Sequence, residues 1–440
     1  MTRELIVVQT GQCGNQLGSR LWDLSLQTHA NLSRQGATDS KICFDRGMNV
    51  MFRNVDYRNG FPLEIGRPIS ALKARPVLVD MENGVIDSIL RSPLGELFTQ
   101  PQLVTDVSGS GNNWAVGYKE YGVKHGDSIM ESFRIQLECC DCVDSIILLQ
   151  SLSGGTGSGL GSYILEQLAN EVPKINKMVV PVFPSETDNV VTAPYNSLLS
   201  LKALIDFADV VIAVDNDSLF RHDHYSIAPL HGTNTNIKNA YDPANSLVAT
   251  MIDTITTSVR IGGDVVAFPS DIRRLTCVDN KFLSPALYMF KDEVPLKRSR
   301  VSLAAAFGGR YHERFRMIRS FRMDTAVSNS YFYVGNQPLG SVVKAMEGSP
   351  DSNTLFACFS KDRSEHSVLL ELGDCRSFHK VLSGISDNFS RLYNRKAHLH
   401  HYLEHVEHGH LHDAQDSVER LIQTHVGRSR NVANKILSRR

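Results

Sequence analysis

Six short apolar runs precede residue 220, and they limit the possible folds more than any other feature of this chain. They lie at residues 5–9, 77–80, 103–107, 145–150, 178–183 and 210–214. Several are apolar at consecutive positions, which is typical of parallel strands buried on both faces. Helical patterns separate them, at residues 16–29, 84–90, 129–139 and 160–171. This alternation predicts an α/β fold with a doubly wound, mostly parallel sheet.

The second half of the chain follows a different pattern. Residues 245–259 have apolar side chains at helical spacing. Strand-like runs lie at 301–307, 330–334 and 354–359, and a helical pattern returns at 387–425 with an interruption near Gly409. Because 440 residues are too many for one compact core, we predict four regions. They are a parallel-sheet domain at 1–240 with a loop at 221–238, a core helix at 241–260, a smaller mixed α/β domain at 261–386, and C-terminal helices with a basic tail at 387–440.

The composition argues against several classes of protein. The formal net charge is -1, so no overall field attracts the chain to nucleic acid or to a membrane. No apolar run approaches the roughly 18 residues of a membrane-spanning helix, and the run at residues 5–8 is too short for the core of a signal peptide. The eight cysteines lack the spacing of secreted proteins. We therefore expect a cytoplasmic protein with reduced thiols and no nucleic-acid or membrane partner.

A glycine-rich segment at residues 153–159, with the sequence SGGTGSG, lies between a predicted strand and a predicted helix. Glycine lets the backbone approach an anion closely, and the N-terminus of a helix offers free N–H groups. Thr156 and Ser158 add hydroxyl donors. The segment lacks the Gly-Lys-Ser/Thr of a Walker A loop and the G-x-G-x-x-G spacing of dinucleotide-binding folds. A flexible turn remains the alternative for this segment taken alone.

Three further loops follow predicted strands, at residues 11–16, 80–84 and 109–114, and they are rich in glycine, amide and carboxylate groups. In an open parallel sheet, the loops at the carboxyl ends of the strands build the ligand site. No lysine lies among them, so backbone amides and a divalent cation must balance the charge of a polyphosphate. The loops therefore predict a polyphosphate ligand bound together with Mg²⁺.

Three segments resemble tubulin signatures and occur in the same order: GQCGNQ at 11–16, GGTGSG at 154–159 and APYNS at 193–197. The resemblance extends from residue 2 to about residue 425. Within the superfamily, residues 108–117 and 396–403 resemble the epsilon class more than the alpha, beta or gamma classes. The resemblance implies a tubulin-like fold that binds GTP and Mg²⁺, and a slow GTPase activity completed by a neighbouring subunit. It also implies a role in centriole or basal-body assembly, with other tubulins (delta-tubulin among them) and centriole proteins as partners.

The resemblance also implies roles for individual residues. Gln12, Asp80 and Glu82 match positions near the phosphate-bound magnesium. Asn216 and Asn245 match asparagines that read guanine, which a carboxamide can do because it both donates and accepts, and Tyr241 matches the ring that stacks on the base. Singly, each of these would more often be a helix cap or a packing residue. The other implied nucleotide contacts are Gly11, Cys13, Gln16, Asn112, Ser153, Gly154, Gly155, Thr156, Gly157 and Ser158.

Two positions depart from the tubulin pattern. Ala193 replaces the family glutamate before Pro-Tyr-Asn, so the ribose contact is expected from Asp188 or from the backbone. Ser153 replaces the first glycine of the phosphate loop, which is tolerable only where the backbone does not need a positive φ.

In tubulins, an acid from a loop of the adjacent subunit completes the site, and the matching loop here falls within residues 263–275. Counting from Gly263 makes Asp271 the catalytic residue acting in trans, whereas matching residues 271–275 to beta-tubulin puts Arg274 at that position. A carboxylate could activate water, but a guanidinium stays protonated. We favour the beta-like alignment, because five consecutive positions agree, and it predicts a face that does not stimulate hydrolysis.

Three clusters lack an assigned chemistry. Cys139, Cys140 and Cys142 lack the fourth ligand and the spacing of a zinc site, and we interpret them as small buried apolar side chains. Seven histidines at residues 398–412 also lack ligand spacing and are expected to be solvated or packed. The tail after Val426 has five basic residues and no acid, and we expect a disordered terminus able to dock on an acidic surface.

Two functions from other classes remain as alternatives. One is a soluble GTP-binding adaptor that never enters a polymer. The other is an NAD-dependent enzyme on a Rossmann fold, against which the spacing of the glycines counts. The nucleotide that co-purifies with the protein would decide between GTP and NAD.

Overall fold

The computed structural model describes residues 2–36, 42–185, 189–221, 240–261, 268–275, 281–291, 317, 329–335, 353–359, 366–373 and 378–437. The strands are β1 (Glu4–Thr10), β2 (Phe52–Val55), β3 (Ala71–Ala74), β4 (Pro76–Asp80), β5 (Leu103–Thr105), β6 (Val143–Ser151), β7 (Asn176–Phe183), β8 (Val210–Ile212), β9 (Val214–Asp215), β10 (Phe282–Lys291), β11 (Asn329–Gly335), β12 (Asn353–Phe359) and β13 (His366–Gly373). The α-helices are α1 (Gly11–Gly36), α2 (Arg46–Asn49), α3 (Asn83–Leu90), α4 (Gly122–Glu138), α5 (Gly161–Glu171), α6 (Ala193–Phe207), α7 (Asn216–Arg221), α8 (Asp242–Ile261), α9 (Pro269–Leu275), α12 (Phe378–Asn394), α13 (His400–Leu403) and α14 (His408–Leu437). Short helical turns of other pitch are Pro93–Leu97, Gln100–Gln102, Val116–Tyr121 and Thr156–Leu160.

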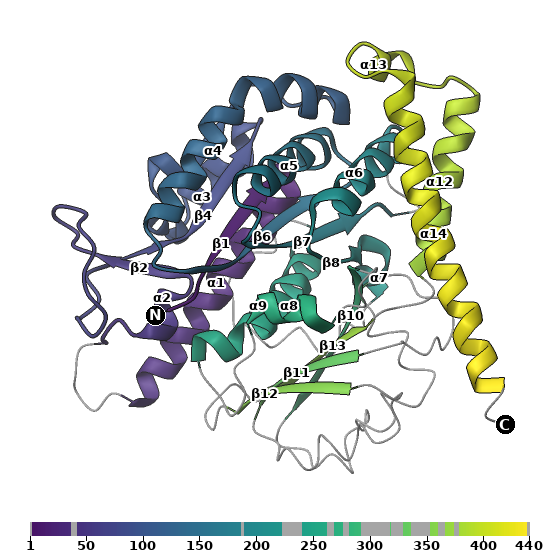
Figure 1. Cartoon of the computed structure of the whole chain (residues 1–440). Helices are drawn as coiled ribbons and strands as arrows, with labels where there is room; N and C mark the ends of the chain where they lie inside the picture. The colour runs from purple at the N-terminus through teal and green to yellow at the C-terminus, as the bar shows by residue number, and fades with distance from the viewer. Residues whose placement is uncertain are drawn as a thin grey trace.

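One large sheet runs through the molecule (Figure 1). Its strand order is β12-β11-β13-β10-β8-β7-β6-β1-β4-β5, and the neighbours from β8 to β5 are parallel. The consecutive apolar residues of β1 fill both sides of this sheet. Leu5 and Val7 belong to one hydrophobic cluster, and Ile6 and Val8 belong to the other. The predicted α/β class, with a mostly parallel sheet, is confirmed.

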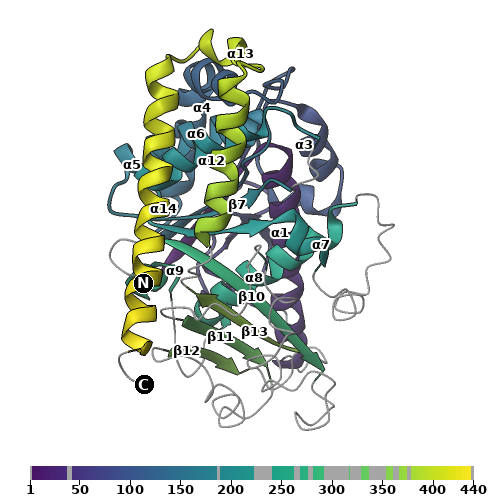
Figure 2. The same cartoon turned by 90° about the vertical axis from the view of Figure 1, so that its right-hand side faces the viewer.

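Helices cover both faces of the sheet. Buried residues of α1, α3 and α8 pack in the cluster that contains Leu5, whereas those of α4, α5, α6, α12 and α14 pack in the opposite cluster. The helices α12 and α14 form a long pair connected through α13, and Figure 2 shows this pair in front of α6. We call α12, α13, α14 and the residues between them the C-terminal hairpin.

The strand β10 connects the second half of the chain to the parallel sheet. Phe282 and Leu283 pair in parallel with Val211 and Ile212 of β8, and β10 pairs along its length with antiparallel β13. The sequence analysis missed β10 and β13. The later strands therefore continue the main sheet, and the division at residue 261 stays a prediction. The strand predicted at 301–307 and nearly all of the loop predicted at 221–238 lie outside the described residues.

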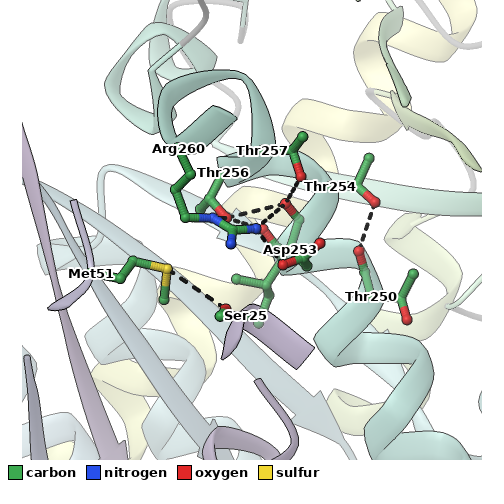
Figure 3. A network of polar contacts seen from close by, with 9 residues as sticks. Ser25, Met51, Thr250, Asp253, Thr254, Thr256, Thr257 and Arg260 are labelled. Atoms are coloured by element: carbon green, nitrogen blue, oxygen red, sulfur yellow. Dashed lines mark hydrogen bonds and ion pairs between the residues drawn. The ribbon is translucent and has the colours of Figure 1, made fainter. Parts of the chain in front are cut away.

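The helix α8 is buried along most of its length and carries an ion pair that the sequence analysis missed. Arg260 pairs with the carboxylate of Asp253, and its Nε donates to Oγ1 of Thr256 at 3.1 Å (Figure 3). The hydroxyls of Thr254 and Thr257 donate to the carbonyls of Thr250 and Asp253, at 2.7 and 2.6 Å. Polar side chains can be buried here because most of their hydrogen bonds close within the helix.

Several predicted boundaries are corrected. The turn predicted at residues 11–16 is already part of α1, which begins directly after β1. The run predicted at 210–214 is divided between β8 and β9. The boundary predicted between residues 386 and 387 lies inside α12. The interruption of the C-terminal helices surrounds α13, and Gly409 belongs to α14. The tail predicted to be disordered is helical as far as Leu437. The sequence did not predict this helix because the apolar residues of the tail are too few to form a helical pattern.

The cysteine cluster differs from its prediction. Cys139 and Cys140 are half-buried and Cys142 is exposed, so a buried apolar role is wrong for Cys142. Nη1 of Arg53 lies 2.8 Å from Sγ of Cys139, and Nη1 of Arg75 lies 3.1 Å from Sγ of Cys140. Within the described ranges, no three His, Cys, Asp or Glu side chains converge as metal ligands. None of the helices described here combines the length and hydropathy needed to cross a membrane.

Candidate functional site

The loops after β1, β4 and β6 surround a pocket of about 330 Å³, which lies in the usual size range of small-ligand sites. Of the predicted contacts, Ser158 does not line this pocket, and Asp188 lies outside the described residues. All other predicted nucleotide and metal contacts line the pocket. The lining residues are Thr10, Gly11, Gln12, Cys13, Gln16, Asp80, Glu82, Ser110, Gly111, Asn112, Ser151, Ser153, Gly154, Gly155, Thr156, Gly157, Asn216, Tyr241 and Asn245.

The glycine-rich loop leads from β6 through the turn Thr156–Leu160 into α5 and lies directly against the start of α1. Gly11 has φ +71°, and a Cβ there would lie 2.9 Å from the backbone nitrogen of Gly157, so only glycine allows this approach. The hydroxyls of Ser110 and Thr156 lie 3.1 Å apart and connect this loop to residues 109–114. Ser153 has no positive φ, so serine is tolerated where the family has glycine.

Ser158 is placed differently from its prediction. Its side chain is fully buried, and its hydroxyl donates to the carbonyl of Gly154. The hydroxyl closes a bond inside the first helical turn after the loop, whereas Thr156 lines the pocket and its hydroxyl contacts that of Ser110. The sequence could not separate the two, because both lie in one glycine-rich segment.

Asp80 ends β4 as a buried carboxylate with one unpaired oxygen. Its Oδ1 accepts from the backbone nitrogen of Glu82 at 3.3 Å, whereas Oδ2 has no hydrogen-bond partner among the described residues. Burial raises the pKa of Asp80 to about 6, although the hydrogen bond from Glu82 acts in the opposite direction. Glu82 is exposed beside Gly109, where a Cβ would lie 2.1 Å from its Oε1. A buried carboxylate in this state fits a bound cation.

Asn216, Tyr241 and Asn245 form another part of the wall. Asn245 is 7% exposed, and its Nδ2 has no hydrogen-bond partner in the described part of the chain. Tyr241 is 46% exposed, and its ring centroid lies 5.5 Å from that of Phe220. An amide without a partner and an open aromatic ring at one pocket can bind a planar heterocycle by hydrogen bonding and stacking.

The sequence analysis missed two lining residues, Thr10 and Ser151, and it predicted Ser110 and Gly111 only as part of the loop at residues 109–114. Thr10 and Ser151 are the last residues of β1 and β6, which were predicted to end one residue earlier. The oxygen Oγ1 of Thr10 is buried without a hydrogen-bond partner among the residues that the structure describes. Burial raises the pKa of the neighbouring Cys13 to about 12, so its thiol stays protonated at neutral pH.

The two candidate positions for the hydrolytic residue lie on α9, outside this pocket. Oδ2 of Asp271 accepts from the backbone nitrogen of Phe268 at 2.9 Å, and its Oδ1 lies 3.4 Å from Nη1 of Arg274. The side chain of Arg274 is 84% exposed and that of Asp271 is 26% exposed. The carboxylate is therefore engaged in a helix cap and an ion pair, whereas the guanidinium projects into solvent.

An open parallel sheet with an anion-binding glycine loop, carboxylates and carboxamides at one edge defines an α/β nucleotide-binding protein. The model of the Tubulin/FtsZ family, GTPase domain, matches residues 4–223. Tubulin epsilon chains of Mus musculus and Homo sapiens are 32% and 33% identical to this chain. Each alignment covers 95% of this chain and 94% of the relative. A tubulin beta chain of Coprinopsis cinerea is 28% identical over 91% of this chain and 90% of its own. The chain therefore belongs to the Tubulin/FtsZ family, as a GTP-binding protein similar to tubulin epsilon chains.

Proposed function

We propose that this protein binds GTP with Mg²⁺ in the pocket and acts as a structural tubulin in centriole or basal-body assembly. The observation that carries the binding site is the coincidence of unpaired buried donors and acceptors with the pocket wall. Buried polar groups normally have partners, so Asp80, Asn245 and Thr10 are groups that a ligand would complete. The role in centrioles rests on the resemblance of residues 108–117 and 396–403 to the epsilon class.

Each part of the pocket has a proposed task. Asp80, Glu82 and Gln12 hold Mg²⁺, which supplies positive charge to the phosphates. The backbone of residues 153–157 and of residues 111–112 binds the phosphate oxygens. Asn216 and Asn245 read the guanine edge, and Tyr241 stacks on the base.

The proposed partners are other tubulin-family subunits as longitudinal neighbours, delta-tubulin among them, in the cytoplasm and at the centriole. A soluble GTP-binding adaptor is the second candidate, and co-sedimentation with tubulin polymers separates the two. The NAD-dependent enzyme is not supported, since the described loops keep a glycine spacing foreign to dinucleotide-binding folds.

We also propose that this chain does not stimulate hydrolysis in the neighbour whose nucleotide it covers. Asp271 is occupied by the cap of α9 and by Arg274. The exposed Arg274 cannot act as a base. Both features support the beta-like alignment.

Replacing Gly154 tests the phosphate loop with little risk to the fold. A Cβ at Gly154 would meet only Oδ1 of Asn112, at 3.7 Å, whereas one at Gly157 would lie 3.1 Å from the backbone of Ser151. Gly154→Val therefore fills the pocket, and we expect that GTP no longer raises its melting temperature, since stabilisation follows occupancy. Gly384→Val, where a Cβ meets open space on α12, is the control. Full protection of Gly154→Val by GTP would contradict the assignment of this loop.

A further inference from the structure

Asn196 of α6 connects two loops of the pocket to the C-terminal hairpin. Its side chain is 0% exposed. Nδ2 donates to the carbonyls of Asn112 and Ser153, at 2.8 and 2.7 Å. Oδ1 accepts from the backbone nitrogen of Trp114 at 2.8 Å and from the hydroxyl of Tyr402 at 2.5 Å. All four bonds open to a carboxamide are thus made. Asn112 and Ser153 line the pocket but Asn196 does not, so it acts through them.

The loop that Asn196 holds has a left-handed turn of backbone. Gly111 and Asn112 have φ +58° and φ +54°, a conformation that glycine adopts freely and asparagine more readily than most residues. Besides the bond from Asn196, the carbonyl of Asn112 accepts from the hydroxyl of Thr192 at 2.7 Å. The position of this pocket wall therefore depends on two donors that lie behind it.

The C-terminal hairpin is bonded to the same loop. Tyr402 belongs to α13, and its ring stacks on Tyr195 at a centroid distance of 4.7 Å. Nδ2 of Asn113 donates to the carbonyl of His401 at 2.9 Å, and the hydroxyl of Tyr195 donates to the carbonyl of Ala397 at 2.9 Å. Burial raises the pKa of Tyr402, so its hydroxyl remains a donor to Asn196. A shift of α13 would therefore reach the two pocket loops through Asn196, and the loop at residues 109–114 also through Asn113.

We propose that Asn196 is a positioning residue that fixes the spacing of the two phosphate-binding loops and couples it to the C-terminal hairpin. The proposal rests on the GTP site proposed above. A partner that displaces the hairpin would then lower the affinity for GTP, and bound GTP would weaken that partner by the same factor. The opposing view is that Asn196 only satisfies buried carbonyls and contributes to folding alone.

The substitution Asn196→Asp separates these views, because it keeps the shape and replaces the two amide donors by a carboxyl that offers one O–H at most. We expect the affinity for GTP to fall by roughly tenfold or more, since the two pocket carbonyls lose at least one of the bonds that fix their spacing. The preference for GTP over ITP, which lacks the guanine amino group, should stay at the wild-type value because Asn216 and Asn245 are unchanged. Competition against a fluorescent GTP analogue measures both quantities. Asn245→Ala should also lower the affinity, but with the preference itself reduced.

Tyr402→Phe tests the link to the hairpin with less risk to the fold. It keeps the stacked ring and removes the bond to Asn196 together with a longer one, of 3.5 Å, to the carbonyl of Thr192. GTP affinity should therefore fall by about two- to fivefold with the GTP/ITP preference unchanged. Tyr393→Phe is the matched control in the same hairpin, since its hydroxyl bonds His408 and His412 and no pocket loop. We expect wild-type affinity in that variant.

The outcomes separate this proposal from the proposed function. If folded Asn196→Asp binds GTP with wild-type affinity, the positioning role is overturned. It is also overturned if the GTP/ITP preference of this variant falls together with its affinity. Equal affinities in Tyr402→Phe and Tyr393→Phe would overturn the link to the hairpin, and this pair decides the matter where Asn196→Asp does not fold. A wild-type protein that binds no guanine nucleotide would contradict the proposed function instead.

Discussion

The pocket and the interior of α8 differ in how far their buried polar groups are paired. In the pocket, Thr10, Asp80 and Asn245 each have a buried atom without a hydrogen-bond partner among the described residues. Along α8, Asp253 and Arg260 form an ion pair that Thr256 supports. The same helix contributes to both regions, because Asn245 lies near its start and Arg260 near its end. The groups in α8 are mostly paired within the helix, although Nη1 of Arg260 is also buried without a hydrogen-bond partner among the described residues. The unpaired groups of the pocket are those that the proposed ligand would complete.

An unpaired atom alone does not mark a site. Both polar atoms of the Gln9 and Gln150 side chains are also buried without a hydrogen-bond partner in the described part of the chain. These side chains lie against Gly18 of α1 and Gly161 of α5, and neither lines the pocket. The assignment therefore depends on the pocket and the unpaired groups together.

The largest expected effect is on the paired side of this comparison. Asp253→Ala leaves the buried Arg260 without its partner, so the free energy of unfolding should fall by about 3–5 kcal/mol. Urea unfolding of the nucleotide-free protein measures the loss. The folded fraction should keep its affinity for GTP, and the partly buried Thr250→Val is a mild control. A loss below about 1 kcal/mol would contradict a structural role for the pair.

Asp80→Asn should move stability and binding in opposite directions. The pKa of Asp80 is raised from 3.8 to about 6 in the folded protein. Above pH 6 the carboxylate is charged in both states and burying it destabilises the fold, whereas below about pH 4 it is protonated in both states and this penalty disappears. The neutral amide removes this penalty, and the nucleotide-free variant should gain about 2–3 kcal/mol at pH 7.5 and almost nothing at pH 4. Mg²⁺-dependent GTP binding should be lost.

Urea unfolding at the two pH values, with a Mg²⁺ titration of GTP binding, checks this trade-off. Wild-type GTP binding should also weaken as the pH falls through about 6, because protonated Asp80 is a poor ligand for a cation. An Asp80→Asn protein that is less stable at pH 7.5 would show that the carboxylate is a structural group.

Asn245→Ala should lower the affinity for GTP with little effect on stability. Loss of the carboxamide leaves the guanine edge with Asn216 alone and one of its polar groups unpaired, at a cost of about 1–3 kcal/mol, or roughly five- to hundredfold in affinity. Isothermal titration with GTP and with ITP measures the change and its dependence on the base. Unchanged GTP binding in the folded variant would sink the assignment of Asn245.

The smallest expected effect concerns hydrolysis. In assembled material, Asp271→Asn should leave GTP turnover at the wild-type rate, because this carboxylate already serves α9 and Arg274. Arg274→Glu should leave turnover unchanged or raise it by supplying an exposed acid. Phosphate release from polymers of matched mass is the measurement. A large loss in Asp271→Asn, with assembly intact, would show that Asp271 is the acid acting in trans.

The sequence was most informative where a local pattern decides the structure. The runs at β1, β6 and β7 have apolar residues on both faces. This pattern is typical of a parallel sheet that is covered by helices on both sides. Loops at the carboxyl ends of such strands meet at one edge, so the position of the pocket followed from the predicted parallel arrangement of the strands. Tyr241 and Asn245 could be placed there only through the resemblance, because residues at the start of α8 reach the pocket by tertiary packing.

The remaining features depend on contacts between distant residues or on a single turn of backbone. The Asp253–Arg260 pair has a spacing that also occurs on solvated helices, and only the burial of α8 makes it structural. The hydroxyls of Thr156 and Ser158 diverge because residues two apart in a helical turn point to nearly opposite sides of it. The strands β10 and β13 were missed because short, mostly apolar runs such as 286–290 and 368–372 fit a strand or a buried helix, and only their pairing, which joins residues far apart in the chain, decides between the two.

The central claim is that the unpaired groups of the pocket bind a guanine nucleotide. Acid extraction of protein purified without added nucleotide, followed by chromatography and mass spectrometry of the extract, tests it most directly. We predict stoichiometric GTP or GDP with the wild-type protein and none with Gly154→Val. An adenine or nicotinamide nucleotide in the wild-type extract, or an empty protein that also fails to bind added GTP, would contradict the claim.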